Sequence, residues 1–309
     1  MVFFTVLLVL LVEQARALSP ENRVHQMVRQ TVAWTEGFFH AGQERHYGVM
    51  ALVGLTGGWT LAAFALWWLM SEWALGLAWV FTLGLLYLTI GFRQFSQRFT
   101  DMQLALNQND VARAAAIYIE WRRQTRPDAE LSLAGLDSNR LVRLALEHAL
   151  VCAFRQVFAV LFWFMVMPGP SGVVLYRVSE LAARSWEQTG RTLKSEFAWA
   201  AHRWLAVMDW IPVRLTALAY AVAGQFEEAA LVWRQSRDLR PDAEALLLDA
   251  GFAAMGLRSV SAVRADSLAA FPERPLVSMD LAFAARLIWR ALALWMGMLL
   301  LLTVIGPFR

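Results

Sequence analysis

The sequence predicts an all-α, polytopic integral membrane protein with a cytoplasmic helical layer. Of its 309 residues, 58% are hydrophobic and 17% are charged, and the mean hydropathy is +0.44. Soluble domains have an apolar share of about 45–50%. The apolar residues also cluster in runs separated by arginine-rich stretches, and the longer runs reach the length of about 20 residues that crosses a bilayer as a helix. No segment shows the period-2 alternation typical of a strand.

The first apolar run, residues 2–12, predicts a short membrane helix that is retained in the protein. Ala15-Arg16-Ala17 resembles a signal-peptide cleavage site. However, no positive charge precedes the run, and Glu13 and Gln14 stand where a cleavage region is small and neutral. We therefore expect a membrane helix rather than a cleaved leader.

Residues 49–70 and 73–90 predict a helical hairpin whose turn is Ser71-Glu72. Arginines precede and follow the hairpin, but its turn contains none. Because cytoplasmic loops collect Lys and Arg, this pattern places residues 13–47 and 92–148 in the cytoplasm of a bacterial cell, with the hairpin in the inner membrane.

Residues 100–148 predict two or three amphipathic helices outside the membrane. Polar and small apolar residues recur there with helical spacing, and Asn109-Asp110 is a typical helix cap. Asp137-Ser138-Asn139 indicates the start of a further helix, which we expect over residues 140–164.

The apolar run over residues 157–178 is interrupted by Pro168-Gly169-Pro170-Ser171-Gly172 and has an arginine near each end. Two interpretations stay open. One is a re-entrant hairpin of two half-length helices, which is tolerated at membrane depth only where its backbone is buried in protein or lines a wet cavity. The other is a single span over residues 150–168 followed by a loop.

Residues 204–224 leave a similar choice between a re-entrant and an interfacial element, because arginines flank both sides and Pro212 lies inside the segment. We expect an amphipathic helix over residues 226–234, a further helix over residues 242–255, and a final span over residues 291–305. The chain is predicted to form one membrane domain over residues 1–309, with cytoplasmic segments at about 92–148 and 226–290.

Several functions are disfavoured by the sequence. Lys194 is the only lysine, and basic loops beside membrane helices explain the formal charge of +3 better than nucleic-acid binding does. The single Cys152 excludes an internal disulfide framework. No phosphate-binding glycine loop is present, and the five histidines are not spaced as metal ligands. We therefore expect no metal, no cofactor and no catalytic residue.

The strongest site candidates are Asp209 and Arg214, because ionised groups within an apolar segment cost about 2.5–3.5 kcal/mol each on insertion scales. They are expected to pair with each other or to bind an anionic ligand, and a structural ion pair stays equally open. Arg177 and Arg203 are expected to be interfacial anchors. The full set of ligand-binding or structural candidates is Asp209, Arg214, Glu147, Arg155, Tyr176, Arg177 and Arg203.

Several segments, taken in order, resemble the superfamily of CobD/CbiB and AmpE membrane proteins. They are residues 4–13, Leu161-Phe162-Trp163, Gly169-Pro170, Leu175-Tyr176-Arg177, residues 209–215 and the closing apolar helix. The resemblance covers nearly the whole chain. For the enzyme branch, it implies joining an aminopropanol phosphate to adenosylcobyric acid with ATP and magnesium. For the AmpE branch, it implies an inner-membrane protein linked to cell-wall recycling and β-lactamase induction.

The acidic motifs of the enzyme branch are absent from this sequence. Residues 151–156 replace a Glu-Asn-Thr-x-Asp-Gly motif, Glu180-Leu181-Ala182-Ala183 replaces Asn-Thr-Leu-Asp, and Leu205-Ala206 replaces a pair of aspartates. In addition, Asn22-Arg23-Val24 replaces His-Pro-Val. Magnesium requires oxygen ligands, so the loss of these acidic residues favours the AmpE branch. The segment Asp-Trp-Ile-Pro-Val-Arg-Leu at residues 209–215 also resembles the corresponding segment of AmpE proteins.

The expected function is therefore that of an AmpE-like regulatory or sensory protein without enzyme activity. Its partners would be the lipid bilayer and a small anionic or amphiphilic ligand, with a homo-oligomer left open and nucleic acid excluded. The alternatives are a cobalamin-pathway ligase of the CobD/CbiB type, which forms an amide with ATP, and a non-enzymatic membrane scaffold.

Overall fold

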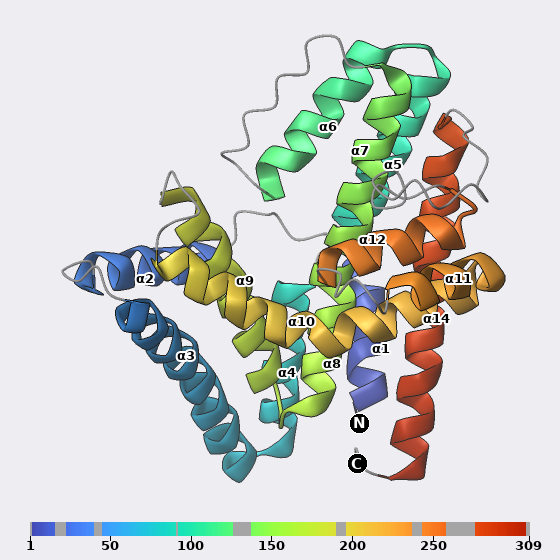
Figure 1. Cartoon of the computed structure of the whole chain (residues 1–309). Coiled ribbons are helices and arrows are strands. Elements are labelled where there is room, and N and C mark those ends of the chain that lie inside the picture. The colour runs from blue at the N-terminus through green and yellow to red at the C-terminus, as the bar shows by residue number, and fades with distance from the viewer. Residues whose placement is uncertain are drawn as a thin grey trace. The chain divides into compact units, whose positions relative to one another are not determined.

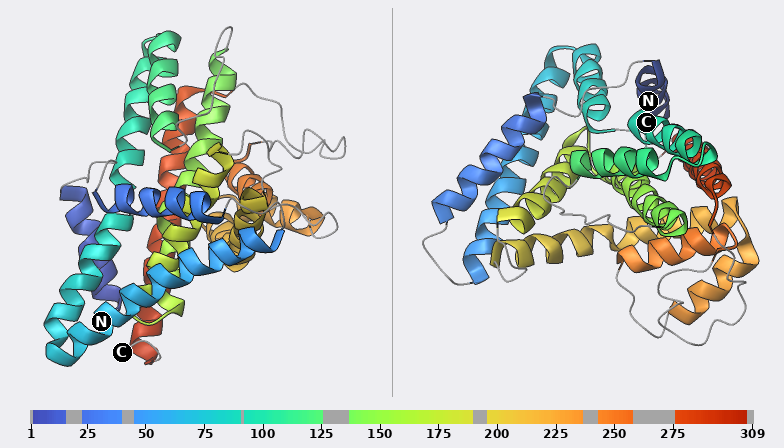
Figure 2. Two further views of the ribbon diagram at one scale, coloured as in Figure 1. Left: turned by 90° about the vertical axis from the view of Figure 1, so that its left-hand side faces the viewer. Right: turned by 90° about the horizontal axis from the view of Figure 1, so that it is seen from above.

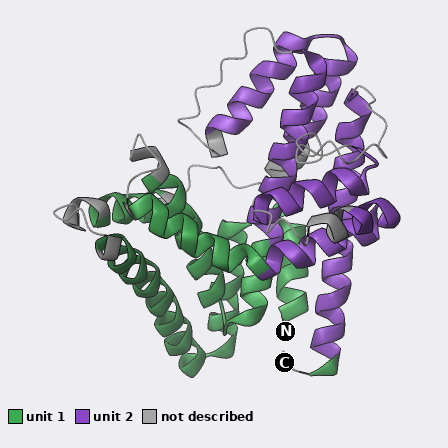
Figure 3. Ribbon diagram, viewed as in Figure 1, with its two compact units in different colours: residues 1–91, 159–210, 305–309 green, residues 92–158, 211–304 purple. Residues whose placement is uncertain are grey.

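The computed structural model describes residues 2–15, 23–39, 45–90, 92–125, 137–189, 196–236, 243–257 and 276–306. Every regular element within these ranges is a helix, and none of the described residues lies in a strand (Figure 1). This confirms the predicted all-α fold class. The chain divides into two compact units, residues 1–91, 159–210 and 305–309 in the first and residues 92–158 and 211–304 in the second (Figure 3).

Unit 1 is organised around one helix, α9. This helix contacts α2, α3, α4 and α8, and α1 contacts α4. The helices of this unit are α1 (Val2–Ala15), α2 (Arg23–Phe39), α3 (Arg45–Trp73), α4 (Leu75–Thr89), α8 (Ala159–Val166), α9 (Ser171–Thr189) and the part of α10 (Glu196–Ala223) up to Trp210. A central helix surrounded in this way has most of its side chains buried, so its polar residues need partners within the protein.

The predicted hairpin is formed by α3 and α4, which pack against each other. The chain turns at Ala74, which is extended with φ −163° and ψ 125°, rather than at Ser71-Glu72. Helix α3 therefore continues through the predicted turn. Helix α4 is also joined to α1, because the indole nitrogen of Trp79 donates a hydrogen bond to the Thr5 hydroxyl at 2.9 Å.

A tight turn joins α8 to α9 at the predicted Pro/Gly segment. Gly169 has φ +59°, a left-handed conformation that strains other residues. A Cβ on Gly172 would lie 2.0 Å from the carbonyl oxygen of Trp163, so the two helices approach closely there. Helix α8 ends a helical stretch, Ser138–Val166, that is longer than the half-length arm of a re-entrant hairpin. The structure contains no membrane, so the choice between spanning and re-entry stays open.

Unit 2 begins with α5 (Phe92–Asn107) and α6 (Val111–Thr125), which pack against each other and run side by side in the left-hand view of Figure 2. They pack against α7 (Ser138–Ala153). The predicted cap is confirmed, because the Asp110 carboxylate accepts a hydrogen bond from the backbone N–H of Arg113 at 2.9 Å. The ring of Trp121 lies between Phe99 and His148, with centroid distances of 5.9 and 4.5 Å, and forms the core of these three helices.

The rest of unit 2 comprises a π-helical turn and three further helices. They are η1 (Phe154–Phe158), α11 (Phe226–Ser236), α12 (Ala243–Ala254) and α14 (Ser278–Ile305). Helices α11 and α12 lie where helices were predicted, over residues 226–234 and 242–255. Helix α14 begins 13 residues before the predicted start at residue 291, because its first turns are amphipathic rather than wholly apolar. The intervening residues 258–275 lie outside the described ranges.

Four helical stretches within the described residues are long and apolar enough to cross a membrane. They are Tyr47–Trp73, Ser138–Val166, Phe197–Ala223 and Ser278–Ile305, and Val2–Gln14 and Leu75–Thr89 are shorter apolar helices. Helix α10 is continuous through Pro212, whose carbonyl oxygen accepts a hydrogen bond from the Thr216 hydroxyl at 2.8 Å. These helices support a membrane-embedded protein, and the single-domain assignment over residues 1–309 stays a prediction.

Candidate functional site

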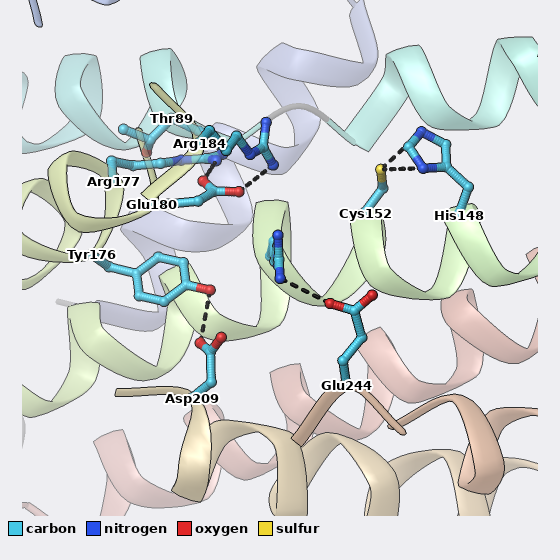
Figure 4. A network of polar contacts seen from close by, with 10 residues as sticks. Thr89, His148, Cys152, Tyr176, Arg177, Glu180, Arg184, Asp209 and Glu244 are labelled. Atoms are coloured by element: carbon cyan, nitrogen blue, oxygen red, sulfur yellow. Dashed lines mark hydrogen bonds and ion pairs between the residues drawn. The ribbon is translucent and has the colours of Figure 1, made fainter. Parts of the chain in front are cut away.

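Helix α9 carries the main group of buried polar side chains in unit 1. Tyr176, Ser179 and Glu180 are each at most 1% exposed. Residues three or four positions apart lie close together on a helix surface, so these three side chains are neighbours, with Ser179 on one side of Tyr176 and Glu180 on the other. The two sides meet different partners in unit 1 (Figure 4).

The first partner is Asp209 on α10. The Tyr176 hydroxyl donates a hydrogen bond to Asp209 Oδ1 at 3.0 Å, and the Asp209 residue is 6% exposed. A buried carboxylate is costly unless hydrogen bonds compensate for its lost hydration, and hydrogen bonds to a charged oxygen are stronger than neutral ones. This contact joins two of the segments that carry the family resemblance, although they are 33 residues apart in sequence.

A second hydrogen bond joins α9 to the same part of α10. The indole nitrogen of Trp204 donates to the Ser179 hydroxyl oxygen at 3.0 Å, and that hydroxyl donates to the Leu175 carbonyl at 2.7 Å. The Ser179 hydroxyl therefore both donates and accepts a hydrogen bond. The two links fix the position of Asp209 relative to Tyr176 within unit 1.

The other side of α9 carries one carboxylate between two guanidinium groups. Glu180 Oε2 accepts from Nη1 of Arg177 at 2.6 Å, and Oε1 accepts from Nη2 of Arg184. Nη2 of Arg177 also donates to the carbonyl oxygen of Thr89, the last residue of α4. Because the C-terminus of a helix has partial negative charge, a cation is favourable there. We call Arg177, Glu180 and Arg184 the α9 charge triad.

In unit 2, the π-helical turn places Arg155 beside α12. Its Nη2 lies 3.0 Å from Glu244 Oε2, in an ion pair whose side chains are 14% and 40% exposed. Glu147 lies two turns earlier on α7 and is half-buried, and Arg143 and Arg122 are its cationic neighbours. The candidates Glu147 and Arg155 thus belong to a charged group of unit 2, separate from the α9 charge triad of unit 1.

The same part of unit 2 contains two residues with distinctive chemistry. The Cys152 sulfur lies 3.5 Å from Nε2 of His148, one turn earlier on α7. The Tyr118 hydroxyl accepts a hydrogen bond from Arg122 at 2.9 Å. Burial raises the pKa of Tyr118 above its ordinary value, despite the opposing effect of Arg122. Tyr118 is therefore neutral at physiological pH.

The predicted pairing of Asp209 with Arg214 stays a prediction. Both lie on α10, but the division between the units falls between them, so each belongs to a separate group. A separation of five residues corresponds to about 140° around a helix axis, which is less favourable for contact than a separation of four. Arg214 is half-buried, and Arg203 is exposed near the start of α10. That Arg203 is an interfacial anchor stays a prediction.

Sequence analysis missed several members of these groups. Arg184, Ser179, Trp204 and Glu244 were not among the candidates, and Glu180 was considered only as part of the segment that replaces an Asn-Thr-Leu-Asp motif. The ion pairs of Glu180 with Arg177 and Arg184 could have been predicted from the sequence, because residues three and four positions apart on a helix are neighbours. The partners on other helices had no signal in the sequence.

No group of three or more His, Cys, Asp or Glu residues in the described ranges is arranged to hold a metal ion. Magnesium at phosphate sites is commonly held by one or two carboxylates together with phosphate oxygens. The described residues therefore provide no metal cage made by protein alone, and we assign no magnesium ligand.

The apolar helices and the buried polar groups between them define a helical membrane protein with a polar site. Comparison with protein families makes the assignment specific, because residues 5–258 match the model of the family described as CobD/Cbib protein. The chain belongs to this family. No solved structure gives a significant match to it.

Two curated relatives carry the same description, "Cobalamin biosynthesis protein CobD". The protein of Stutzerimonas stutzeri is 31% identical over 232 residues, 73% of each chain. The protein of Chromobacterium violaceum is 31% identical over 259 residues, which is 80% of this chain and 77% of that protein.

These comparisons correct the function predicted from the sequence. The preference for the AmpE branch is not supported, and the prediction of an AmpE-like regulatory or sensory protein is wrong, because the matching family and both relatives are of the CobD type. The error came from treating a few missing acidic motifs as decisive. Similarity spread over about three quarters of the chain carries more weight than those positions.

Proposed function

We propose that this chain acts in cobalamin biosynthesis as a multi-pass protein of the bacterial inner membrane. The observation that carries the proposal is the similarity to proteins named for cobalamin biosynthesis, at 31% identity over 73% and 80% of the chain. The family match also includes Tyr176, Arg177 and Asp209, which are positioned by contacts within unit 1.

The reaction that we propose is the one implied by the family resemblance, amide formation between an aminopropanol phosphate and adenosylcobyric acid with ATP. The phosphate-bearing substrates are anionic, so a site for them needs cationic hydrogen-bond donors. A guanidinium group binds phosphate and carboxylate through two parallel hydrogen bonds. The arginines of the α9 charge triad are candidates for this role in unit 1.

Magnesium is implied by the same resemblance, but the described residues do not form a protein cage for it. The positions aligned with the family's acidic motif are residues 151–156, which contain no Asp or Glu. We therefore derive no step of the reaction through the metal. The role of this chain's residues is limited to binding and orienting anionic groups.

Complementation of a bacterial strain that lacks its own CobD/CbiB protein tests the proposal. We expect the gene to restore cobalamin-dependent growth, and we expect Asp209→Asn to reduce growth because it removes the charged acceptor of the Tyr176 hydrogen bond. Immunoblotting of membrane fractions checks that both proteins are inserted. A membrane scaffold without enzyme activity would give no growth although the protein is present in the membrane, and that result would contradict the proposal.

A further inference from the structure

The α9 charge triad has an uneven distribution of burial. The Glu180 side chain is 1% exposed, whereas those of Arg177 and Arg184 are 13% and 21% exposed. The anion is thus enclosed and the two cations form the accessible edge of the group. The accessible edge of the α9 charge triad is therefore positively charged.

Arg177 also has hydrogen-bonding capacity that the described residues do not use. Its two terminal nitrogens donate to Glu180 and to the Thr89 carbonyl. Its Nε is buried and has no acceptor among the described residues. A guanidinium has five N–H donors in a fixed plane, and a buried donor without an acceptor is uncommon. The guanidinium of Arg177 therefore has donor capacity beyond the two hydrogen bonds that it makes.

A purely structural ion pair is the competing explanation. Buried ion pairs contribute little net stability, because desolvation offsets their attraction, and apolar residues of similar size often replace them without loss. A contribution to the stability of the fold is therefore a poor explanation for three charged residues at these positions.

We propose that Arg177 and Arg184 form a binding site for the phosphate group of a substrate, and that Glu180 is the positioning residue that holds both guanidinium groups in place. The choice of a phosphate-bearing substrate rests on the proposed function. The Thr89 carbonyl at the end of α4 orients the plane of the Arg177 guanidinium, and Glu180 bridges it to Arg184 one turn further along α9. The phosphate oxygens would accept from the outward edges of the two cations.

Thermal unfolding of the purified full chain in detergent tests this site, with inorganic phosphate as the probe and chloride of equal ionic strength as the reference. Phosphate that binds the folded protein raises its Tm with concentration. We expect a saturable rise for the wild type. For Glu180→Gln and Arg177→Lys, we expect apparent affinity to fall about tenfold, as loss of a charged hydrogen bond predicts.

Two further variants separate positioning from general destabilisation. Glu180→Asp keeps the negative charge and is expected to retain most of the phosphate-dependent rise. If Glu180 were merely structural, Glu180→Gln would lower the Tm without phosphate and leave the phosphate-dependent rise unchanged. Arg286→Lys changes an exposed arginine on α14 in unit 2 and is expected to leave the rise unchanged. The wild-type measurement alone keeps the proposal testable if Glu180→Gln does not fold.

The site proposal is wrong if phosphate stabilises the wild type no more than chloride does, or if Glu180→Gln binds phosphate as the wild type does. Its failure is distinguishable from failure of the proposed function. Growth complementation without phosphate binding would overturn the site and leave the function, whereas phosphate binding without complementation would support the site and contradict the function.

Discussion

At the scale of single residues, two buried tyrosines differ in whether the hydroxyl group has a hydrogen-bond partner, and this difference decides how much each hydroxyl stabilises the fold. Tyr176 and Tyr220 are both fully buried. The Tyr176 hydroxyl donates to Asp209, whereas the Tyr220 hydroxyl has no hydrogen-bond partner among the described residues and packs beside Phe158, at 5.9 Å between ring centroids. A buried hydroxyl stabilises a fold only when it is satisfied.

We therefore expect Tyr176→Phe to lower the free energy of unfolding by about 1.5–3 kcal/mol, the range for a hydrogen bond to a charged group. Tyr220→Phe is the matched control and is expected to be neutral or stabilising, because it removes a hydroxyl without a partner. Thermal or denaturant unfolding in detergent measures both. Equal losses in the two variants would show that the Asp209 contact contributes nothing specific.

The sequence identified Tyr176, Arg177 and Asp209 as candidates but not how they are connected. The partner of Arg177 on its own helix follows from spacing three residues along α9. The partner of Tyr176 is 33 residues away, so it depends on the packing of α9 against α10. No local pattern encodes such a contact. The pairing of Asp209 with Arg214, which the sequence suggested beside an anionic ligand, stays a prediction.

At the scale of elements, the α8–α9 turn depends on glycine for space. A Cβ on Gly172 would meet the Trp163 carbonyl oxygen at 2.0 Å, and the backbone must shift to avoid it. We expect Gly172→Ala to destabilise the protein by about 1–3 kcal/mol, the usual cost of overpacking.

Gly84→Ala on α4 is the control, because nothing lies within 4 Å of a Cβ there and alanine favours a helix. Unfolding in detergent measures both variants. Similar stability for the two would contradict the close approach of α8 and α9.

The sequence predicted the type of each element well and the boundaries less well. Pro168 to Gly172 and Asp110 were recognised because proline, glycine and capping residues act locally. The helix predicted over residues 140–164 agrees with the helical stretch Ser138–Val166, but its π-helical turn at Phe154–Phe158 had no sequence signature of its own. The amphipathic start of α14 was missed for the opposite reason, because apolarity alone was used to place the final span.

At the scale of the whole molecule, the distribution of arginine predicts a topology with residues 92–148 in the cytoplasm and the α3–α4 turn outside. The single Cys152 simplifies the test, because one substitution gives a cysteine-free background. We expect Glu72→Cys to react with an impermeant maleimide in intact cells with a permeable outer membrane. We expect Asp101→Cys to react only after the inner membrane is opened. Labelling of both from the same side would contradict the topology.

The function was harder to predict than the fold, and the reason is chemical. The metal argument assumed that magnesium needs acidic residues at fixed positions, whereas phosphate oxygens can provide much of its coordination. Loss of Asp and Glu from residues 151–156 therefore does not separate the two branches of the superfamily. Similarity to the CobD relatives over most of the chain separates the two branches, and it supports a role in cobalamin biosynthesis.

The most direct measurement of the central claim is the corrinoid content of the complemented strain, determined by mass spectrometry. A strain without its CobD/CbiB protein is expected to accumulate adenosylcobyric acid. Expression of this chain is predicted to lower that pool and to produce the aminopropanol-phosphate amide and cobalamin. An unchanged pool of adenosylcobyric acid without the amide, in cells whose membranes contain the protein, would contradict the proposed function.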